Sequence, residues 1–140
     1  MTHDITTQWK GNMLFESDNP NGNTLLMESS PDFEGTGTGL SPKALMLSSL
    51  AGCTGLDLLS LFKKMRVELD GITINVHGEL TEEHPIHYHA VKVDYHFYGK
   101  DINEAKVSKA VNLSEERYCG VMEMFRKFAE VTTEIHFHNQ

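Results

Sequence analysis

An uncharged and mostly apolar segment, residues 44–56, is the feature that most limits how this chain can fold. Ser41 is a plausible N-cap and Pro42 occupies the first helical position, so we predict a helix from Pro42 to about Arg66. The first part of this helix is apolar on nearly every face, which predicts burial on all sides. The uncharged run has 13 residues, against roughly 20 for a membrane-spanning helix. We therefore interpret it as the buried core helix of a cytoplasmic protein.

The size and charge of the chain exclude several classes of function. With 140 residues and no internal repeat, it is expected to form a single domain over residues 1–140. Its 20 acidic and 12 basic residues give a formal net charge of −8, which disfavours nucleic acid and anionic membranes as partners. Residues 1–10 lack the apolar stretch of a secretory signal.

The residues around the long helix predict strands and shorter helices. Before it, alternating side chains predict three strands with a turn at Asn21-Gly22, and a glycine-rich loop fills residues 29–40. After it, alternation predicts an antiparallel hairpin, followed by two helices and a final strand. The predicted strands are residues 5–9, 12–16, 24–28, 72–80, 87–98 and 130–138; the later helices are 103–113 and 121–129.

This order of elements predicts an α+β fold rather than the regular alternation of a doubly wound sheet. We expect antiparallel sheets around the long, buried central helix. A helix that is apolar all round needs cover that one small sheet cannot supply. We therefore expect a homodimer with this helix near the interface.

Two cysteines are the candidates for chemistry. Cys53 lies between Gly52 and Gly55, which are poor helix formers, so their presence suggests close backbone approach or access for a ligand. Cys119 follows Arg117 just before the last helix, where a helix N-terminus and a cation both favour the thiolate. Inert core cysteines are the alternative for both, and nothing in their spacing shows whether they pair.

Two rival sites are weaker. The pairs His87/His89 and His136/His138 each share a strand face and could bind a metal, but the spacing of zinc fingers and cupins is absent, which favours exposed strand histidines. The run GTGTG at residues 35–39 precedes a helix but lacks the Lys-Ser/Thr ending of a P-loop and fails the pattern GxGxxG.

Residues 37–66 carry a specific resemblance. After the first glycine they read TGLSPKALMLSSLAGCTGLDLLSLFKKMR, which resembles the OsmC/Ohr family and in particular its OsmC-like branch. A second match is SEERYCGV, which contains Cys119. The strands at the start and the hairpin after the helix also fit, so the resemblance covers essentially the whole chain. It implies an intertwined homodimer with long central helices and sites at the interface.

The resemblance also implies an activity. The chain would be a cysteine-based peroxidase that reduces organic hydroperoxides or hydrogen peroxide. Cys53 would become a sulfenic acid and Cys119 would resolve it as a disulfide, which an external dithiol would reduce. No bound cofactor or metal is implied. The alternative is a non-enzymatic protein of the same fold that binds a small apolar ligand at the interface or senses thiol oxidation.

The sequence departs from the family at the residues that activate the thiol. Family peroxidases carry a glutamate after the proline of the helix start, where this chain has Lys43, and an arginine in the N-terminal strands. The three arginines of this chain all lie after residue 65. Lys10 lies in the corresponding strands, but a lysine cannot form the bidentate fork of an arginine.

Overall fold

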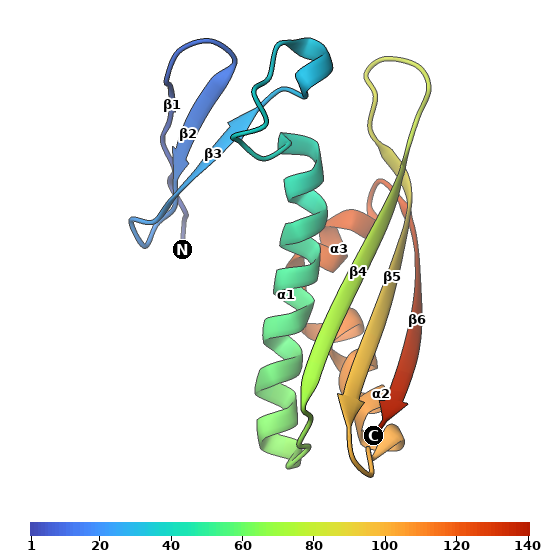
Figure 1. Cartoon of the computed structure of the whole chain (residues 1–140). Helices are drawn as coiled ribbons and strands as arrows, with labels where there is room; N and C mark the ends of the chain where they lie inside the picture. The colour runs from blue at the N-terminus through green and yellow to red at the C-terminus, as the bar shows by residue number, and fades with distance from the viewer. The chain divides into compact units, whose positions relative to one another are not determined.

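The computed structural model describes all residues from 1 to 140. The chain packs as two compact units, Met1–Met46 and Leu47–Gln140, and each is described here by itself (Figure 1). A single domain over the whole chain stays a prediction.

The N-terminal unit contains a three-stranded antiparallel sheet of β1 (Thr7–Trp9), β2 (Leu14–Asp18) and β3 (Thr24–Glu28). The strand predicted from residue 12 begins two residues later. Gly11 and Asn12 both adopt positive φ, 101° and 49°, so the chain is still turning there. The predicted turn at Asn21-Gly22 is confirmed, with Gly22 at φ 87°.

The glycine-rich loop after β3 wraps around one carboxylate. The buried Glu28 side chain accepts hydrogen bonds from the N–H of Thr36 at 3.1 Å and that of Gly39 at 2.9 Å. A Cβ at Gly35 would collide with the carbonyl of Ser29, and one at Gly39 would lie 2.8 Å from the Met27 carbonyl carbon. These glycines therefore permit close packing of the loop. An internal carboxylate already occupies the amides that a phosphate would need.

Replacing Glu28 by glutamine is expected to destabilise the protein. The amides of Gly39 and then Thr36 lower the pKa of Glu28 below its ordinary value of 4.5. A lowered folded pKa stabilises the fold above pH 4.5, and this contribution is lost as the pH falls through the folded pKa. Thermal unfolding should therefore show a lower Tm for Glu28→Gln at pH 7, and the difference from wild type should shrink below pH 4.

Glu16→Gln is the matched control for that experiment. Glu16 also lies in this sheet, but its only ion pair is an exposed 3.8 Å contact with Lys10, which contributes little to stability. An equal loss of Tm in both variants, or none in either, would show that the Glu28 contacts do not hold the loop.

Helix α1 spans Pro42–Met65. It buries one stripe, Leu50, Thr54, Leu58 and Phe62, while Leu56 and Leu59 are 69% and 56% exposed. The prediction of burial on all sides is thus wrong for the single chain, because the other elements of the C-terminal unit cover only one face of α1. The length argument against a membrane span also fails: α1 has 24 residues and is long and apolar enough for a span by composition alone. Core helices of soluble proteins meet the same criterion.

A second sheet, in the order β4–β5–β6, forms the C-terminal unit. β4 (Gly71–Leu80) and β5 (Tyr88–Gly99) pair antiparallel as predicted, but β6 (Glu130–Asn139) pairs parallel with β5. The expectation of antiparallel sheets therefore holds for the β1–β2, β2–β3 and β4–β5 pairs and is wrong for the β5–β6 pair. The helices α2 (Glu104–Leu113) and α3 (Gly120–Arg126) form a crossover between β5 and β6, and a crossover is what a parallel pair requires.

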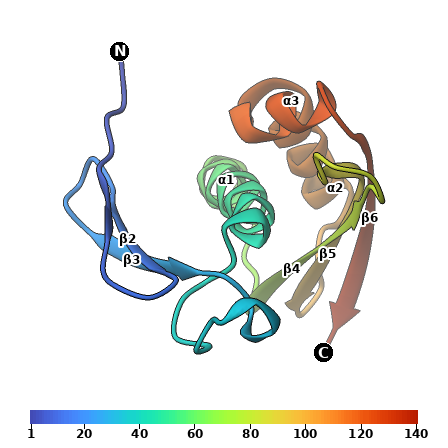
Figure 2. The same ribbon diagram turned by 90° about the horizontal axis from the view of Figure 1, so that it is seen from above.

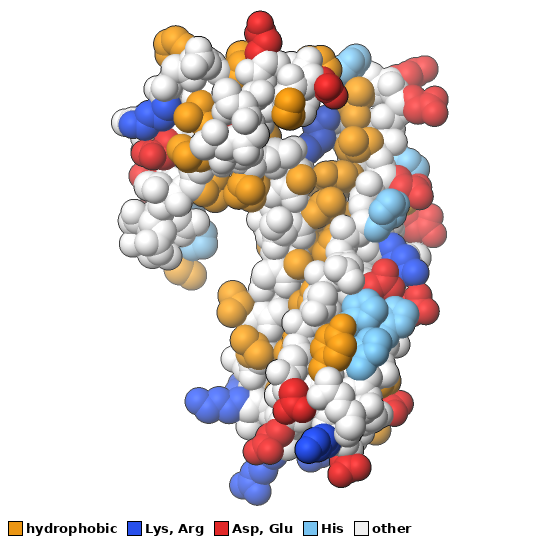
Figure 3. All heavy atoms as spheres, viewed as in Figure 1, with side chains coloured by type: hydrophobic (Ala, Val, Ile, Leu, Met, Phe, Trp, Pro, Cys, Tyr) orange, Lys and Arg blue, Asp and Glu red, His pale blue; other side chains and the backbone are white.

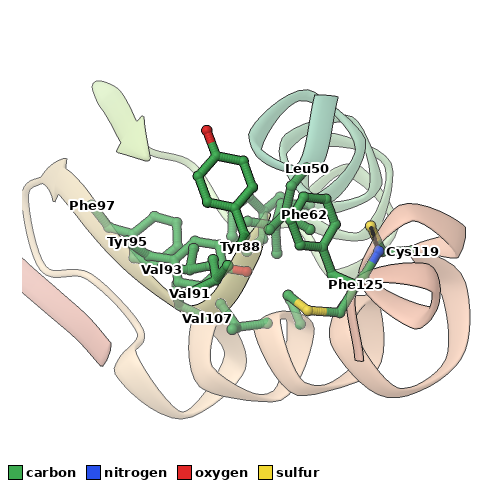
Figure 4. Packing of buried hydrophobic residues seen from close by; sticks show 14 residues of the cluster. Leu50, Phe62, Tyr88, Val91, Val93, Tyr95, Phe97, Val107, Cys119 and Phe125 are labelled. Atoms are coloured by element: carbon green, nitrogen blue, oxygen red, sulfur yellow. Dashed lines mark hydrogen bonds between the residues drawn. The ribbon is translucent and has the colours of Figure 1, made fainter. Parts of the chain in front are cut away.

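The hydrophobic core lies between one face of this sheet and the helices, which all cover that face (Figure 2). The inward side chains of β5 are Val91, Val93, Tyr95 and Phe97, in the predicted alternation. Phe62 of α1 packs edge-on against Phe97 with 5.8 Å between ring centroids. Cys119 belongs to the same core (Figure 4). The α+β fold class is confirmed.

Candidate functional site

The fold brings the two cysteines together. Cys53 lies in the middle of α1, and Cys119 is the N-cap of α3. The sulfur atoms of both cysteines and a carboxylate oxygen of Asp57 lie within 4.8 Å of one another. Both thiols are free. Residues 66 positions apart in the chain thus form one small cluster.

A π-helical turn, Ser114–Tyr118, sets the position of Cys119. The N–H of Cys119 donates to the carbonyl oxygen of Ser114 at 2.7 Å, which closes this wide turn. The Cys119 sulfur then accepts the N–H of Met122 at 3.3 Å. Its side chain is only 3% exposed (Figure 4). Such turns occur often at functional sites, and the sequence showed only a break at this point.

Asp57 was not predicted from the sequence to be part of the site. It lies four residues after Cys53 on α1, a spacing that places two side chains on the same helix face. The hydroxyl of Ser114 donates to Asp57 Oδ2 at 3.2 Å. The i,i+4 spacing could have predicted that Asp57 shares a helix face with Cys53. Only the fold shows that Ser114 and Cys119 lie close to the Asp57 carboxylate.

The environment of Cys119 favours the neutral thiol. Burial, followed by a hydrogen bond with Cys53, raises the pKa of Cys119 to about 12, and the negative charge of Asp57 adds to this effect. The Met122 N–H acts in the opposite direction. The guanidinium of Arg117 lies 5.9 Å from the ring centre of Tyr118. The prediction that the helix terminus and Arg117 favour a Cys119 thiolate is therefore wrong, because desolvation dominates.

A buried tyrosine and a glutamate lie behind the thiols. The fully buried Tyr95 donates its hydroxyl hydrogen to Glu115 Oε2 at 2.7 Å. Burial raises the pKa of both groups. Arg126 donates to the carbonyl oxygen of Glu115 at 2.7 Å, and the hydroxyl of Thr54, next to Cys53, also interacts with Tyr95. These contacts hold α1, β5 and the π-helical turn together beside the thiols. Nothing in the sequence pattern linked Tyr95 to Glu115.

An open groove of about 1030 Å³ lies between α1 and β4. Its wall on α1 includes Ala51, Gly52, Leu56 and Leu59, and its wall on β4 includes Ile72 and Ile74. Neither cysteine lines it, although Gly52 directly precedes Cys53. The groove is therefore an apolar surface separate from the thiol site.

The two histidine pairs lie in different surroundings: His136 belongs to a group of possible metal ligands with Asp94 and Glu134, and His87 and His89 belong to none. His87 bonds to the carbonyl oxygen of Pro85 at 2.9 Å in a loop, and His89 is exposed. His136 and His138 lie on the solvent face of the sheet, where both stack on His96 (Figure 3). His136 Nε2 donates to Asp94 Oδ1 at 2.9 Å.

The residues that depart from the family pattern belong to the N-terminal unit. Lys43 is exposed in the first turn of α1, and Lys10 is paired with Glu16 in the sheet. Of the arginines, Arg126 is bound to the π-helical turn, as described above, and Arg66 ends α1 with a positive φ of 57°. The role of Lys10 as a substitute for the family arginine stays a prediction.

Comparison with known proteins gives a consistent result. The family model described as OsmC-like protein matches residues 35–134. Protein YhfA of Escherichia coli K12 is 26% identical over 125 residues, which cover 89% of this chain and 90% of YhfA. A hypothetical protein from Aquifex aeolicus superposes with a TM-score of 0.81 at 25% identity, over 98% of both chains.

One solved relative carries a functional name. The organic hydroperoxide resistance protein OsmC of Legionella pneumophila superposes with a TM-score of 0.71 at 17% identity, over 97% of both chains. At this identity the likeness shows the fold alone.

Proposed function

Because the chain belongs to the OsmC family, we propose that it is a thiol-dependent peroxidase in which Cys53 reacts with the peroxide and Cys119 resolves the product. One observation is the main support for this proposal. A partly exposed and a buried thiol, from distant parts of the chain, lie within 4.8 Å of each other. Relatives of this fold that are named for organic hydroperoxide resistance support hydroperoxides as the substrate class.

The proposed reaction has three steps. The Cys53 thiolate attacks the outer peroxide oxygen, so that an S–O bond forms, the O–O bond breaks and an alcohol or water leaves after protonation. Cys53 is then a sulfenic acid. The sulfur of Cys119 attacks that of Cys53, forming the disulfide, and the hydroxyl group leaves as water with the proton from Cys119. An external dithiol reduces the disulfide by exchange.

The difference between the two thiols supports these roles. Cys53 is half-buried, so a peroxide can reach it, whereas Cys119 is shielded and stays a neutral thiol at physiological pH because its pKa is about 12. A neutral Cys119 can donate its S–H to the Cys53 sulfur and so stabilise negative charge there. In this way Cys119 would perform part of the task of the arginine that the chain lacks.

We propose that Asp57 is the base of the resolving step. A thiol with a pKa of about 12 must lose its proton to attack, and the Asp57 carboxylate lies within 4.8 Å of that sulfur. Ser114 orients the carboxylate through its 3.2 Å hydrogen bond. Asp57 would accept the proton from Cys119 and return it to the departing hydroxyl group.

Asp57→Asn should therefore slow disulfide formation by roughly 10²-fold, the lower end of the general-base contribution. The first step should keep its rate, because it does not need the carboxylate. Stopped-flow measurement of peroxide loss, combined with dimedone trapping, should show a long-lived Cys53 sulfenic acid. Glu116→Gln, an exposed carboxylate of the same turn, is the control. Disulfide formation at the wild-type rate in Asp57→Asn would exclude this role.

The activity is tested by titrating reduced protein with cumene hydroperoxide and with hydrogen peroxide. About one equivalent should consume both thiols and produce the Cys53–Cys119 disulfide, which peptide mass spectrometry identifies. The oxidant that reacts faster then identifies the substrate class. Survival of both thiols for hours in excess peroxide would refute the proposal.

We further propose that two copies of the chain associate through α1. Leu56 and Leu59 are exposed on this helix, and Gly52 has open space where a Cβ would lie, so another helix can approach closely. A second copy of the chain can cover this surface, because its own α1 exposes the same apolar side chains to solvent. This interface would cover the groove between α1 and β4.

A second candidate function, binding of a small apolar ligand, is favoured by the same groove of about 1030 Å³. Its volume is in the range of small-molecule sites. Native mass spectrometry of the purified protein tests it: a bound apolar molecule, combined with thiols inert to peroxide, would favour a binding or sensing protein over an enzyme.

A further inference from the structure

The cluster of Cys53, Cys119 and Asp57 has a property that peroxide reduction does not use. All three side chains bind metals as anions, and their ligand atoms lie within 4.8 Å of one another. The charged side chain that acts on the Cys119 thiol is the Asp57 carboxylate, itself an anion. Three potential anions thus converge at a half-buried position where a cation would stabilise them all.

We infer that the reduced protein binds one Zn²⁺ ion per chain through Cys53 Sγ, Cys119 Sγ and the Asp57 carboxylate. This inference goes beyond the proposed peroxidase activity and does not depend on it. Three protein ligands and an open fourth position are the usual set of a reactive rather than a structural zinc site.

The geometry needs only small adjustments. Zinc lies about 2.3 Å from thiolate sulfur and about 2.0–2.2 Å from carboxylate oxygen, so tetrahedral ligand atoms are separated by roughly 3.5–3.8 Å. The present separations of up to 4.8 Å close by rotation of the Cys53 and Asp57 side chains, which are only half-buried. Ser114 holds Asp57 Oδ2 and leaves Oδ1 for the metal. A hydrogen bond of this kind orients a metal ligand.

The donor set selects the metal. Thiolates favour zinc over magnesium and calcium, which prefer oxygen ligands. Binding replaces the proton of each thiol by a bond to zinc and releases these protons to solvent, with no change of oxidation state. Coordination to zinc lowers the nucleophilicity of each sulfur towards peroxide, and the disulfide has no thiolate to offer to a metal. Metal binding and oxidation of the pair should therefore exclude each other.

A second group of possible ligands provides the control. Asp94, Glu134 and His136 also lie within 4.8 Å of one another, on the solvent face of the sheet. There the ammonium of Lys92 already forms ion pairs with both carboxylates, at 3.5 Å from Asp94 and 2.9 Å from Glu134. A metal would have to displace this lysine, so the thiol site should bind first.

The test uses reduced, full-length protein under anaerobic conditions. Titration with Zn²⁺ against a chromophoric chelator should give one equivalent per chain, with proton release measured in weak buffer. Titration with Co²⁺ should produce sulfur-to-cobalt charge-transfer absorption and tetrahedral d–d bands. Cys53→Ser and Cys119→Ser should each lose tight binding, and Asp57→Asn should bind at least about tenfold more weakly. His136→Gln should bind like the wild type.

Each outcome decides the inference. Absence of the charge-transfer band, or loss of binding in His136→Gln with retention in Cys53→Ser, would overturn it. Circular dichroism of each variant shows that loss of binding is not loss of fold, and the isosteric Asp57→Asn keeps the test valid where a cysteine variant unfolds. No peroxide is present, so zinc binding without peroxidase activity refutes only the proposed enzyme, and activity without zinc binding refutes only the metal site.

Discussion

Cys53→Ser should reduce the rate of peroxide reduction to that of the uncatalysed reaction, a loss of roughly 10³-fold or more, because a serine hydroxyl is not ionised at neutral pH and is a poor nucleophile. The peroxide should then survive in the presence of the variant and a dithiol. Consumption of hydroperoxide is measured directly, with the wild type at equal concentration. This variant removes the one sulfur that is both half-exposed and adjacent to a second thiol.

Cys119→Ser is the matched variant, and its expected behaviour is different. It retains Cys53, and the serine hydroxyl can donate a hydrogen bond to the Cys53 sulfur as the Cys119 thiol does, so the first equivalent of peroxide should be consumed at close to the wild-type rate. No resolving thiol remains, so a sulfenic acid accumulates and excess peroxide converts it to sulfinic acid. Intact-mass measurement distinguishes these states. Full steady-state activity in Cys53→Ser, or loss of the first reaction in Cys119→Ser alone, would reverse the assigned roles.

Leu59→Glu should convert a dimer into a monomer. Leu59 is 56% exposed on α1 and lines the apolar groove. A carboxylate buried there against a second copy would have to give up its hydration without a partner. A central apolar contact of this type is worth about 2 kcal/mol or more, so the dissociation constant should rise roughly 30-fold or more. Sedimentation velocity over a range of concentrations measures the change.

Leu80→Glu is the control for Leu59→Glu. It makes the same substitution at a leucine that is 45% exposed near the end of β4 and lies outside the groove. This variant should keep the dimer, and both variants should keep the fold because neither position is in the core. A wild type that is monomeric at high concentration, or a Leu59→Glu variant that dimerises as tightly as the wild type, would contradict the proposed interface.

The sequence predicted the elements whose side chains repeat regularly. The alternation in residues 72–98 predicted the β4–β5 hairpin, and Ser41 and Pro42 predicted the start of α1. The parallel pairing of β6 could not be predicted in this way. Alternation shows that a strand has one buried face, but it does not show which neighbour the strand joins or in which direction.

The candidate site was predictable only in part. The motif around Cys53 and the second match around Cys119 were visible in the chain, and they led to the right family. The prediction that Cys119 favours the thiolate was wrong because it considered only local features, a helix N-terminus and Arg117. The burial of the thiol could not be read from the sequence. Desolvation depends on everything that surrounds a group, including residues distant in sequence.

By itself the sequence determined the periodic elements of this protein, the cap and start of its long helix and the two thiols, because these depend on residues a few positions apart. Only the tertiary structure decided that Cys53, Asp57 and Cys119 converge, that Ser114 holds the carboxylate and that Tyr95 bonds to Glu115. Each of these contacts joins elements whose separation along the chain carries no information about their distance in space. They arise from the packing of α1 and the π-helical turn around a shared core, and packing is a property of the whole fold.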